Sequence, residues 1–189
     1  MATTVYHSLA DLPPSTALAV GNFDGVHQGH QAILKRMLTF AEQTGRAPWI
    51  LSFEGAPKGH LDAASAPERI YDLETQTRYL LETGATLIRQ PFTPAFTNLS
   101  ATDFLAQLKG AEIFCGEDWR FGKGAQGNVA FLQTCNATAH VVPYVLHEAT
   151  RISSTRIRAA LAEGAMPLAA AMLGRTWEFS GVVCHGRAL

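Results

Sequence analysis

Two histidines three residues apart, His27 and His30, stand where a short apolar segment gives way to a helical pattern. Residues at this spacing lie on one side of the first turn of a helix, so both imidazoles can donate hydrogen bonds to one phosphate group. Backbone N–H groups at a helix start attract anions, and Gly25 and Gly29 let a phosphate approach the backbone closely. We therefore expect a phosphate site in which the histidines stabilise the growing charge of a departing group. The alternatives are histidines that only cap or pack the helix, or two ligands of a metal ion.

A run of hydroxyl residues, Ser153, Ser154 and Thr155, opens another helical pattern. These side chains can be helix caps and nothing more. The same hydroxyls, with the N–H groups of the helix start, also suit an anion. Arg158 lies one turn further on and can offer a planar, two-pronged donor to a phosphate. Arg156 points elsewhere on the helix, and we expect it to be a solvated surface charge.

A glycine-rich loop at residues 116–128 carries two acids and two aromatic residues. Glu117 or Asp118 could hold Mg²⁺ or a ribose, while Trp119 and Phe121 could face an aromatic ring. Turn carboxylates and aromatics that anchor the loop are equally good interpretations. The glycine spacing matches neither a P-loop nor a dinucleotide-binding fingerprint.

Alternating strands and helices are expected to position these segments. Short apolar stretches predict strands at residues 17–21, 49–53, 86–88, 113–115 and 140–145. Helical patterns begin at Gln28, at Pro67, at Ser100, near Phe131, at Ser153 and at Pro167. This order predicts an α/β fold, with a parallel sheet of about five strands covered by helices on both faces. Ligands bind such sheets at the carboxyl ends of the strands, so we expect the three segments to meet in one cleft.

The residues after Gly174 break this pattern. Residues 177–186 alternate like an antiparallel strand, but a single strand is marginal in water. We therefore predict one domain over residues 1–174. We expect residues 175–189 to be mobile, or to pair with another sheet edge, and to matter little for the chemistry.

Composition narrows the classes of function. The 189 residues are 47% hydrophobic and 16% charged, which suits one domain with a real core, and the formal net charge is −1. The sequence has no blocks of basic residues that would suggest a nucleic-acid partner. It also has no apolar stretch long enough to cross a membrane. The start of the chain does not look like a secretory signal. Three widely spaced cysteines, Cys115, Cys135 and Cys184, predict reduced thiols in a cytoplasmic protein.

Together the three segments resemble the adenylyltransferase module of prokaryotic-type FAD synthetases, the bifunctional riboflavin kinase/FMN adenylyltransferases. The resemblance runs over residues 15–183. The family's first motif matches Gly-Asn-Phe-Asp-Gly-Val-His-Gln-Gly-His at residues 21–30, and its Ile-Ser-Ser-Thr-x-x-Arg motif matches residues 152–158. Its Gly-Glu-Asp-Phe-x-Phe-Gly motif is similar to residues 116–122, where Trp119 replaces a phenylalanine.

The resemblance implies a Rossmann-like nucleotidyltransferase fold and the reaction of ATP with FMN to give FAD and pyrophosphate, with Mg²⁺ held through the phosphates. It implies catalytic roles for His27, His30 and Arg158. The residues expected to bind ATP are Gly21, Asn22, Phe23, Asp24, Gly25, Gly29, Ser153, Ser154 and Thr155. Those expected near the flavin, ribose or metal are Phe53, Asp118, Trp119, Arg120 and Phe121.

Two departures from the family pattern qualify this expectation. Residues 53–57 read Phe-Glu-Gly-Ala-Pro, where the family has Phe-Asp/Glu-Pro-His-Pro beside the nucleotide and flavin. Residues 175–189 resemble a linker or the first strand of the riboflavin kinase barrel, and the chain lacks that domain's Pro-Thr-Ala-Asn motif. We therefore expect no riboflavin kinase activity here, and a C-terminal kinase domain in the full-length protein. A nucleotidyltransferase with another phosphate acceptor, or a silent flavin- or nucleotide-binding protein, are the alternative functions.

Overall fold

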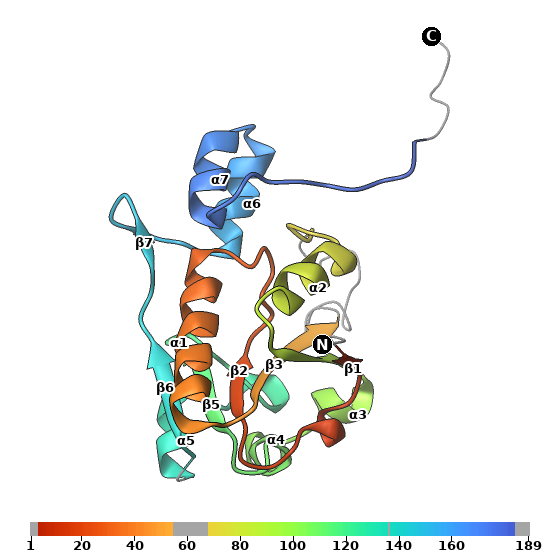
Figure 1. The fold of residues 1–189 in the computed structure, drawn as a ribbon, viewed down its shortest axis with the longest axis vertical. Coiled ribbons are helices and arrows are strands. Elements are labelled where there is room, and N and C mark those ends of the chain that lie inside the picture. The colour runs from red at the N-terminus through yellow and green to blue at the C-terminus, as the bar shows by residue number, and fades with distance from the viewer. Residues whose placement is uncertain (1–3, 55–67, 136, 184–189) are drawn as a thin grey trace.

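The computed structural model describes residues 4–54, 68–135 and 137–183 and contains a six-stranded parallel sheet (Figure 1). The strands are β1 (Val5–Tyr6), β2 (Ala17–Val20), β3 (Pro48–Glu54), β4 (Thr86–Pro91), β5 (Glu112–Gly116) and β6 (Ala139–Val142). Their order is β1-β4-β3-β2-β5-β6, and every neighbouring pair is parallel. The predicted parallel α/β fold is confirmed. The extra strand, β1, was not predicted because two residues are too few to show a pattern.

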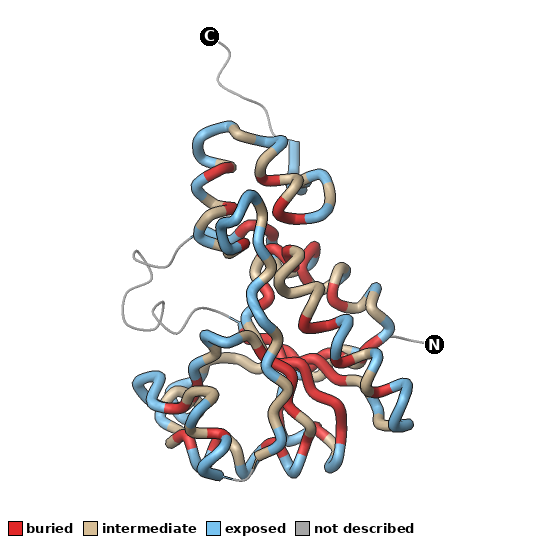
Figure 2. The backbone as a smooth tube through the Cα atoms, turned by 90° about the vertical axis from the view of Figure 1, so that its left-hand side faces the viewer, coloured by how far each residue is buried: buried red, intermediate tan, exposed pale blue. Residues whose placement is uncertain are grey.

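Helices cover both faces of the sheet (Figure 1). They are α1 (Gln28–Thr44), α2 (Leu73–Leu81), α3 (Pro94–Thr97), α4 (Ala101–Gln107), α5 (Val129–Thr134), α6 (Ser154–Ala162) and α7 (Met166–Leu173). Buried residues of α1 and α2 pack on one face, and those of α4 and α5 pack on the other. A third apolar cluster joins α6 and α7 to the loop at Ile70. Figure 2 shows the buried residues concentrated in the strands and on the sheet-facing sides of the helices.

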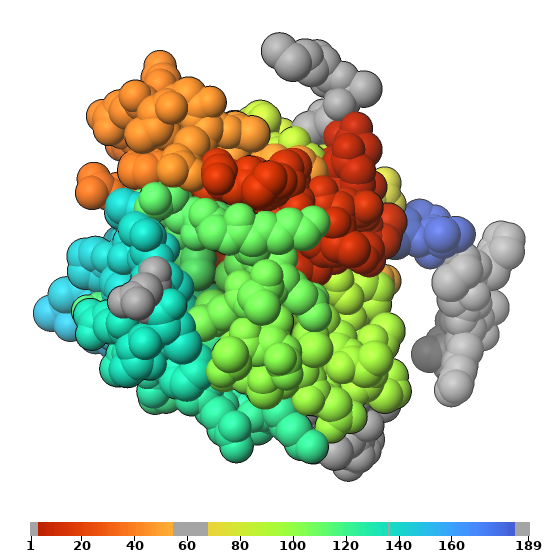
Figure 3. All heavy atoms as spheres, turned by 90° about the horizontal axis from the view of Figure 1, so that it is seen from below, coloured from red at the N-terminus to blue at the C-terminus, as the bar shows by residue number. Residues whose placement is uncertain are grey.

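The strand order changes direction at β2, which has β3 on one side and β5 on the other. In parallel sheets this switch point leaves a crevice at the carboxyl ends of the two strands, where ligands bind. In Figure 1 α6 and α7 lie above this end. The opposite end, seen in Figure 3, is covered by the N-terminal segment, the end of α1, α4 and α5.

Helix ends follow local capping rules, with one correction. Gly45 ends α1 in the left-handed conformation (φ 70°), which glycine adopts readily. The helix predicted from Pro67 instead begins at Leu73. Asp72 is its N-cap and accepts a hydrogen bond from the N–H of Thr75 at 2.7 Å. Pro67 lies outside the described residues.

The strand predicted at residues 140–145 is also shorter than expected. It ends at Val142, because Pro143 has no N–H to continue the ladder. The chain then forms an unpredicted hairpin of β7 (Leu146–His147) and β8 (Thr150–Arg151) before α6. No helix among the described residues is both long enough and apolar enough to span a membrane.

The strand pattern at residues 177–186 does not produce a strand where the structure describes it. Residues 175–183 form no strand. The indole N–H of Trp177 donates to the carbonyl of Ile70 at 2.9 Å, and the hydroxyl of Ser180 donates to Asp72 at 2.7 Å. The alternation reflects docking on the domain, since Trp177 packs against the third cluster while Phe179 is 81% exposed. Residues 184–186 of the predicted strand lie outside the described residues.

Candidate active site

A tight turn links β2 to α1 at the switch point of the sheet. Phe23 (φ 51°) and Val26 (φ 41°) adopt left-handed backbone conformations although both carry side chains, and both side chains are buried. Such conformations persist only when the surroundings enforce them, and they cluster at functional sites. Between them Gly25 has φ 83°, and a Cβ there would lie 2.8 Å from Cδ1 of Ile70. A side chain at position 25 would therefore have both a strained backbone and no room.

The two histidines lie together at the start of α1, as predicted. Their rings stack with centroids 3.6 Å apart and planes inclined by 15°. His27 is also the N-cap, because its Nδ1 accepts a hydrogen bond from the N–H of His30 at 3.3 Å. In the neutral ring this leaves Nε2 as the donor. Capping and phosphate binding are thus compatible here, since they use different nitrogens of His27.

Burial keeps both imidazoles neutral at physiological pH. It lowers the pKa of His27 to about 4, and the nearby positive charge of Arg151 acts in the same direction. Burial also lowers the pKa of His30 well below its ordinary value, followed by the effects of His27 and Arg151. The Nδ1 atom of His30 is buried and has no hydrogen-bond partner among the described residues. A ring nitrogen that is buried without a partner is uncommon in folded proteins and marks His30 as a residue under functional constraint.

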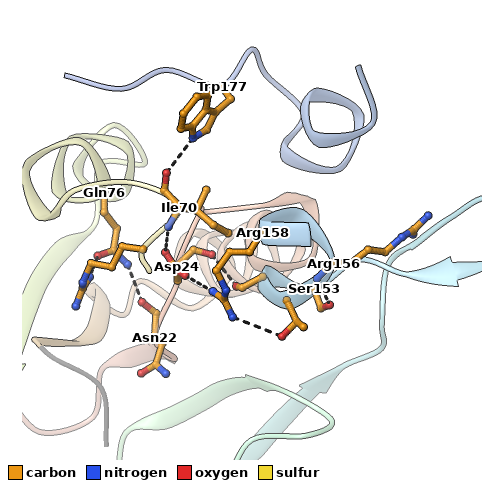
Figure 4. A network of polar contacts seen from close by, with 11 residues as sticks. Asn22, Asp24, Ile70, Gln76, Ser153, Arg156, Arg158 and Trp177 are labelled. Carbon is orange, nitrogen blue, oxygen red and sulfur yellow. Dashed lines mark hydrogen bonds and ion pairs between the residues drawn. The ribbon is translucent and has the colours of Figure 1, made fainter. Parts of the chain in front are cut away.

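Asp24 connects this turn to α6, as Figure 4 shows. Its Oδ2 accepts a hydrogen bond from Nη1 of Arg158 at 2.7 Å, and its backbone carbonyl accepts one from the hydroxyl of Ser154 at 2.9 Å. Its Oδ1 accepts from the N–H of Ile70 at 3.0 Å. Burial raises the pKa of Asp24, against the lowering effects of the Ile70 N–H and of Arg158. Two residues expected at ATP are therefore paired with each other.

The hydroxyl run behaves as a set of caps and connectors. The hydroxyl of Ser153 accepts from the N–H of Arg156 at 3.3 Å and is the N-cap of α6. The hydroxyl oxygen of Thr155 lies 3.5 Å from Nη2 of Arg158. Arg156 is not the solvated charge that we expected, because its Nη1 donates to the carbonyls of His147 and Thr150, each at 3.1 Å. It fixes the β7–β8 hairpin, which the sequence pattern did not reveal.

The loop after β5 joins the same site. Asp118 forms an ion pair with Arg151, whose guanidinium lies 3.8 Å from the ring centroid of Tyr144. Glu117 accepts a hydrogen bond from the N–H of Tyr144 at 3.3 Å. Both Arg151 and Asp118 act electrostatically on His27. The predicted convergence of the three segments is confirmed, and Arg151 is a charged residue that sequence reasoning missed.

The aromatic residues of this region anchor the structure. Phe121 is buried in the core and stacks on Trp119, with ring centroids 4.5 Å apart. Phe53 is also buried and stacks on Phe92 at 5.0 Å. Trp119 is partly exposed and Arg120 is exposed, so these two keep surface that a ligand can reach.

Sequence reasoning also missed a polar cluster behind Asn22. The buried side chain of Gln76 donates to the carbonyl of Asn22 at 2.7 Å and accepts from Arg69 and Arg89, each at 3.2 Å. Arg89 is only 4% exposed, and burial followed by the charge of Arg69 lowers its pKa. The one signal in the sequence was an arginine within the apolar strand segment Thr-Leu-Ile-Arg. The cluster fixes the backbone of Asn22 and leaves its side chain exposed.

Within the described ranges no three His, Cys, Asp or Glu side chains come close enough together to hold a metal ion. The carboxylates at the site, Asp24 and Asp118, are each paired with an arginine. With both carboxylates engaged in ion pairs, these residues do not form a cation site by themselves. The alternative in which His27 and His30 form part of a metal site gains no further ligand from these residues.

Fold and site together define an α/β protein of the nucleotidyltransferase type, with a helix start and paired histidines at the switch point of a parallel sheet. Comparison with protein families gives a match to the FAD synthetase family over residues 10–156. The chain belongs to that family.

Individual relatives agree with this assignment. The chain is 34% identical to a bifunctional riboflavin kinase/FMN adenylyltransferase of Haemophilus influenzae, with 92% of this chain and 59% of the relative aligned. The protein of the same name from Escherichia coli K12 is 31% identical, over 97% of this chain and 62% of the relative. The chain thus spans about three fifths of these relatives. A crystal structure described as a macrolide-efflux protein from Streptococcus pneumoniae superposes with a TM-score of 0.78 at 28% identity, covering 94% of this chain and 61% of that one.

Proposed function

We propose that this chain transfers the adenylyl group of ATP to FMN, giving FAD and pyrophosphate. A phosphate oxygen of FMN attacks the α-phosphorus of ATP, and the bond from that phosphorus to the bridging oxygen of the β-phosphate breaks. Pyrophosphate leaves with the electron pair. The FMN phosphate is already anionic at neutral pH, so the reaction needs no strong general base. Membership of the FAD synthetase family supports this reaction, and the relatives are named for it.

The stacked pair of His27 and His30 at the start of α1 is the observation that carries the proposal. Both rings are neutral, so each offers one N–H to the departing pyrophosphate without a charge that must first be desolvated. The N–H groups and dipole of α1, a helix of 17 residues, favour the same anion. The enzyme's contribution is therefore mainly alignment of two anions and stabilisation of the leaving group.

Arg158 completes the charge distribution in this proposal. It is held by Asp24 at 2.7 Å through Nη1, and its Nη2, only 3.5 Å from the Thr155 hydroxyl, can turn to the triphosphate. Ser153, Ser154 and Thr155 close the far end of the triphosphate through the start of α6. Gly21, Asn22 and Phe23 shape the nucleotide pocket, and Asp118 with Arg120 and Trp119 border the ribose or flavin. Mg²⁺ bound to the phosphates would neutralise part of their charge.

We assign this reaction to residues 1–174 and treat the following residues as the connection to a further domain. No riboflavin kinase activity is proposed for the chain, because no part of its sequence matches the kinase motif. We also propose a cytoplasmic location. Cys115 and Cys135 are free thiols, and reduced thiols are typical of that compartment.

Comparison of acceptors tests the proposal. The purified chain is incubated with ATP, Mg²⁺ and one of FMN, riboflavin, nicotinate mononucleotide or phosphopantetheine, and the products are separated by chromatography. We expect FAD from FMN and no product from the others. A dinucleotide formed from a different phosphate would indicate another nucleotidyltransferase. Binding of FMN and ATP without turnover would indicate a silent binding protein.

A further inference from the structure

The buried residue Ile70 is held from two opposite directions, as Figure 4 shows. Its N–H donates to Oδ1 of Asp24 at 3.0 Å, and its carbonyl accepts from the indole N–H of Trp177 at 2.9 Å. Ile70 therefore lies between a residue of the β2–α1 turn and a residue more than 100 positions later in the chain. Position 70 belongs to no helix or strand, so these contacts fix a segment that has no regular structure of its own.

Side-chain packing ties the same residue to the nucleotide turn. Ile70 is 3% exposed, and its Cδ1 would be 2.8 Å from a Cβ at Gly25. It also belongs to the apolar cluster that includes Ile157 of α6, with Trp177 packed against it. A shift of Ile70 would therefore change both the packing at Gly25 and the hydrogen bond to Asp24.

Further contacts hold Trp177 in place. We use the name strap for residues 175–180. The guanidinium of Arg175 lies 3.9 Å from the ring centroid of Tyr79, and Glu178 accepts a hydrogen bond from the hydroxyl of Tyr79 at 2.7 Å. The hydroxyl of Ser180 donates to Asp72, the N-cap of α2. The strap thus lies along α2, from Tyr79 near its end to its N-cap Asp72, and against the loop that contains Ile70.

We propose that Trp177 is a positioning residue for the nucleotide site, acting through Ile70 on Asp24 and through Asp24 on Arg158. The inference rests on the function proposed above. One carboxylate oxygen of Asp24 accepts a hydrogen bond from Arg158, and the other accepts one from the N–H of Ile70. Loss of the Trp177 hydrogen bond loosens Ile70, so the carboxylate and the guanidinium lose their fixed orientation. Residues beyond the expected domain boundary at Gly174 then belong to the working site.

The charge of Asp24 makes this coupling measurable. The cations that act on it are Arg158, from α6, and Arg69, from the segment before α2, while the N–H of Ile70 hydrogen-bonds its charged form. Burial opposes these groups and raises the pKa of Asp24. A weaker bond from Ile70 removes one stabiliser of the carboxylate, so the pKa rises further. The acidic limb of the rate profile should then move to higher pH.

The test compares Trp177→Phe, which keeps the aromatic side chain and loses the N–H, with Val182→Ala, whose side chain is 93% exposed further along the tail. Phe179 is unsuitable as the control because its ring lies 5.5 Å from that of Trp177. Loss of one hydrogen bond predicts that kcat/KM for ATP, measured at pH 7, falls by about threefold to tenfold. The acidic limb should move to higher pH, so the defect shrinks as the pH is raised. Val182→Ala should match the wild type. A defect of equal size at every pH would overturn the inference, as would no defect at all.

A double-mutant cycle with Asp24→Asn tests the route of the effect. If Trp177 acts through Asp24, Trp177→Phe should add less than twofold in the Asp24→Asn background. Additive defects would show that Trp177 acts by another route. Affinity for ATP, measured by titration calorimetry in the same variants, gives a readout that needs no FMN. If neither the wild type nor any variant makes FAD, but Trp177→Phe still weakens ATP binding relative to Val182→Ala, the proposed function fails and the positioning role stands.

Discussion

Replacing Gly25 by alanine tests how the nucleotide turn is built, and Gly45 offers a matched control. Both glycines have a left-handed backbone, with φ 83° and φ 70°. An alanine in that region costs roughly 1–2 kcal/mol at either position. A Cβ at position 45 would meet no atom within 4 Å, whereas one at position 25 would lie 2.8 Å from Cδ1 and 3.3 Å from Cγ2 of Ile70. Because Ile70 is enclosed, overpacking adds about 1–3 kcal/mol.

We therefore expect Gly25→Ala to lower the free energy of unfolding by about 2–5 kcal/mol and Gly45→Ala by about 1–2 kcal/mol. Urea unfolding of both variants, followed by circular dichroism, measures the difference. Gly25→Ala should also reduce adenylyl transfer, because Ile70 is bonded to Asp24. Gly45→Ala should leave the rate unchanged, since it lies at the far end of α1. Equal destabilisation by the two substitutions would refute the argument that Ile70 occupies the space above Gly25.

Three further predictions concern the histidines and arginines of the site. His30→Ala should lower kcat by about 10²–10³-fold with a smaller change in ATP affinity, because the leaving-group charge grows in the transition state; steady-state kinetics would show a change under twofold if His30 only packs. Arg158→Lys should impair catalysis, since lysine keeps the charge but loses the planar fork, whereas Arg156→Lys should lower stability more than rate, as its Nη1 holds two carbonyls of the hairpin; the reverse order in parallel assays of rate and unfolding would be inconsistent with this assignment. The free energy of unfolding should fall as the pH drops from about 6.5 to about 4, because unfolded His27 binds a proton in this range and the buried ring does not. Urea unfolding at a series of pH values measures this dependence. His27→Asn, which retains a good N-cap, should reduce the slope of the unfolding free energy against pH by the equivalent of up to one proton.

The general architecture could be predicted from the sequence because it depends on local patterns. Apolar strands alternating with amphipathic helices determine a parallel sheet, and the carboxyl-end rule brings the three polar segments together. The spacing of His27 and His30 determines that both rings lie on one side of the helix start. Capping residues such as Ser100 and Ser153 also follow from local chemistry.

The contacts that the sequence did not predict depend on residues far apart in the chain. Arg156 looked like a surface charge because nothing near it in sequence indicated the β7–β8 hairpin that it holds. Gln76 and Arg89 meet only because α2 packs beside β4. The strand predicted after Gly174 failed for a similar reason, since alternation cannot tell a paired strand from a segment that docks Trp177 on a loop.

The position of bond cleavage in ATP tests the central claim most directly. Parallel reactions would contain FMN, Mg²⁺ and ATP labelled at either the α- or the γ-phosphate, and the flavin product would be isolated and counted. Adenylyl transfer predicts that the α-label enters the flavin product in a one-to-one ratio and that the γ-label appears only in pyrophosphate. Label from the γ-phosphate in the flavin, or no transfer of the α-label, would contradict the account.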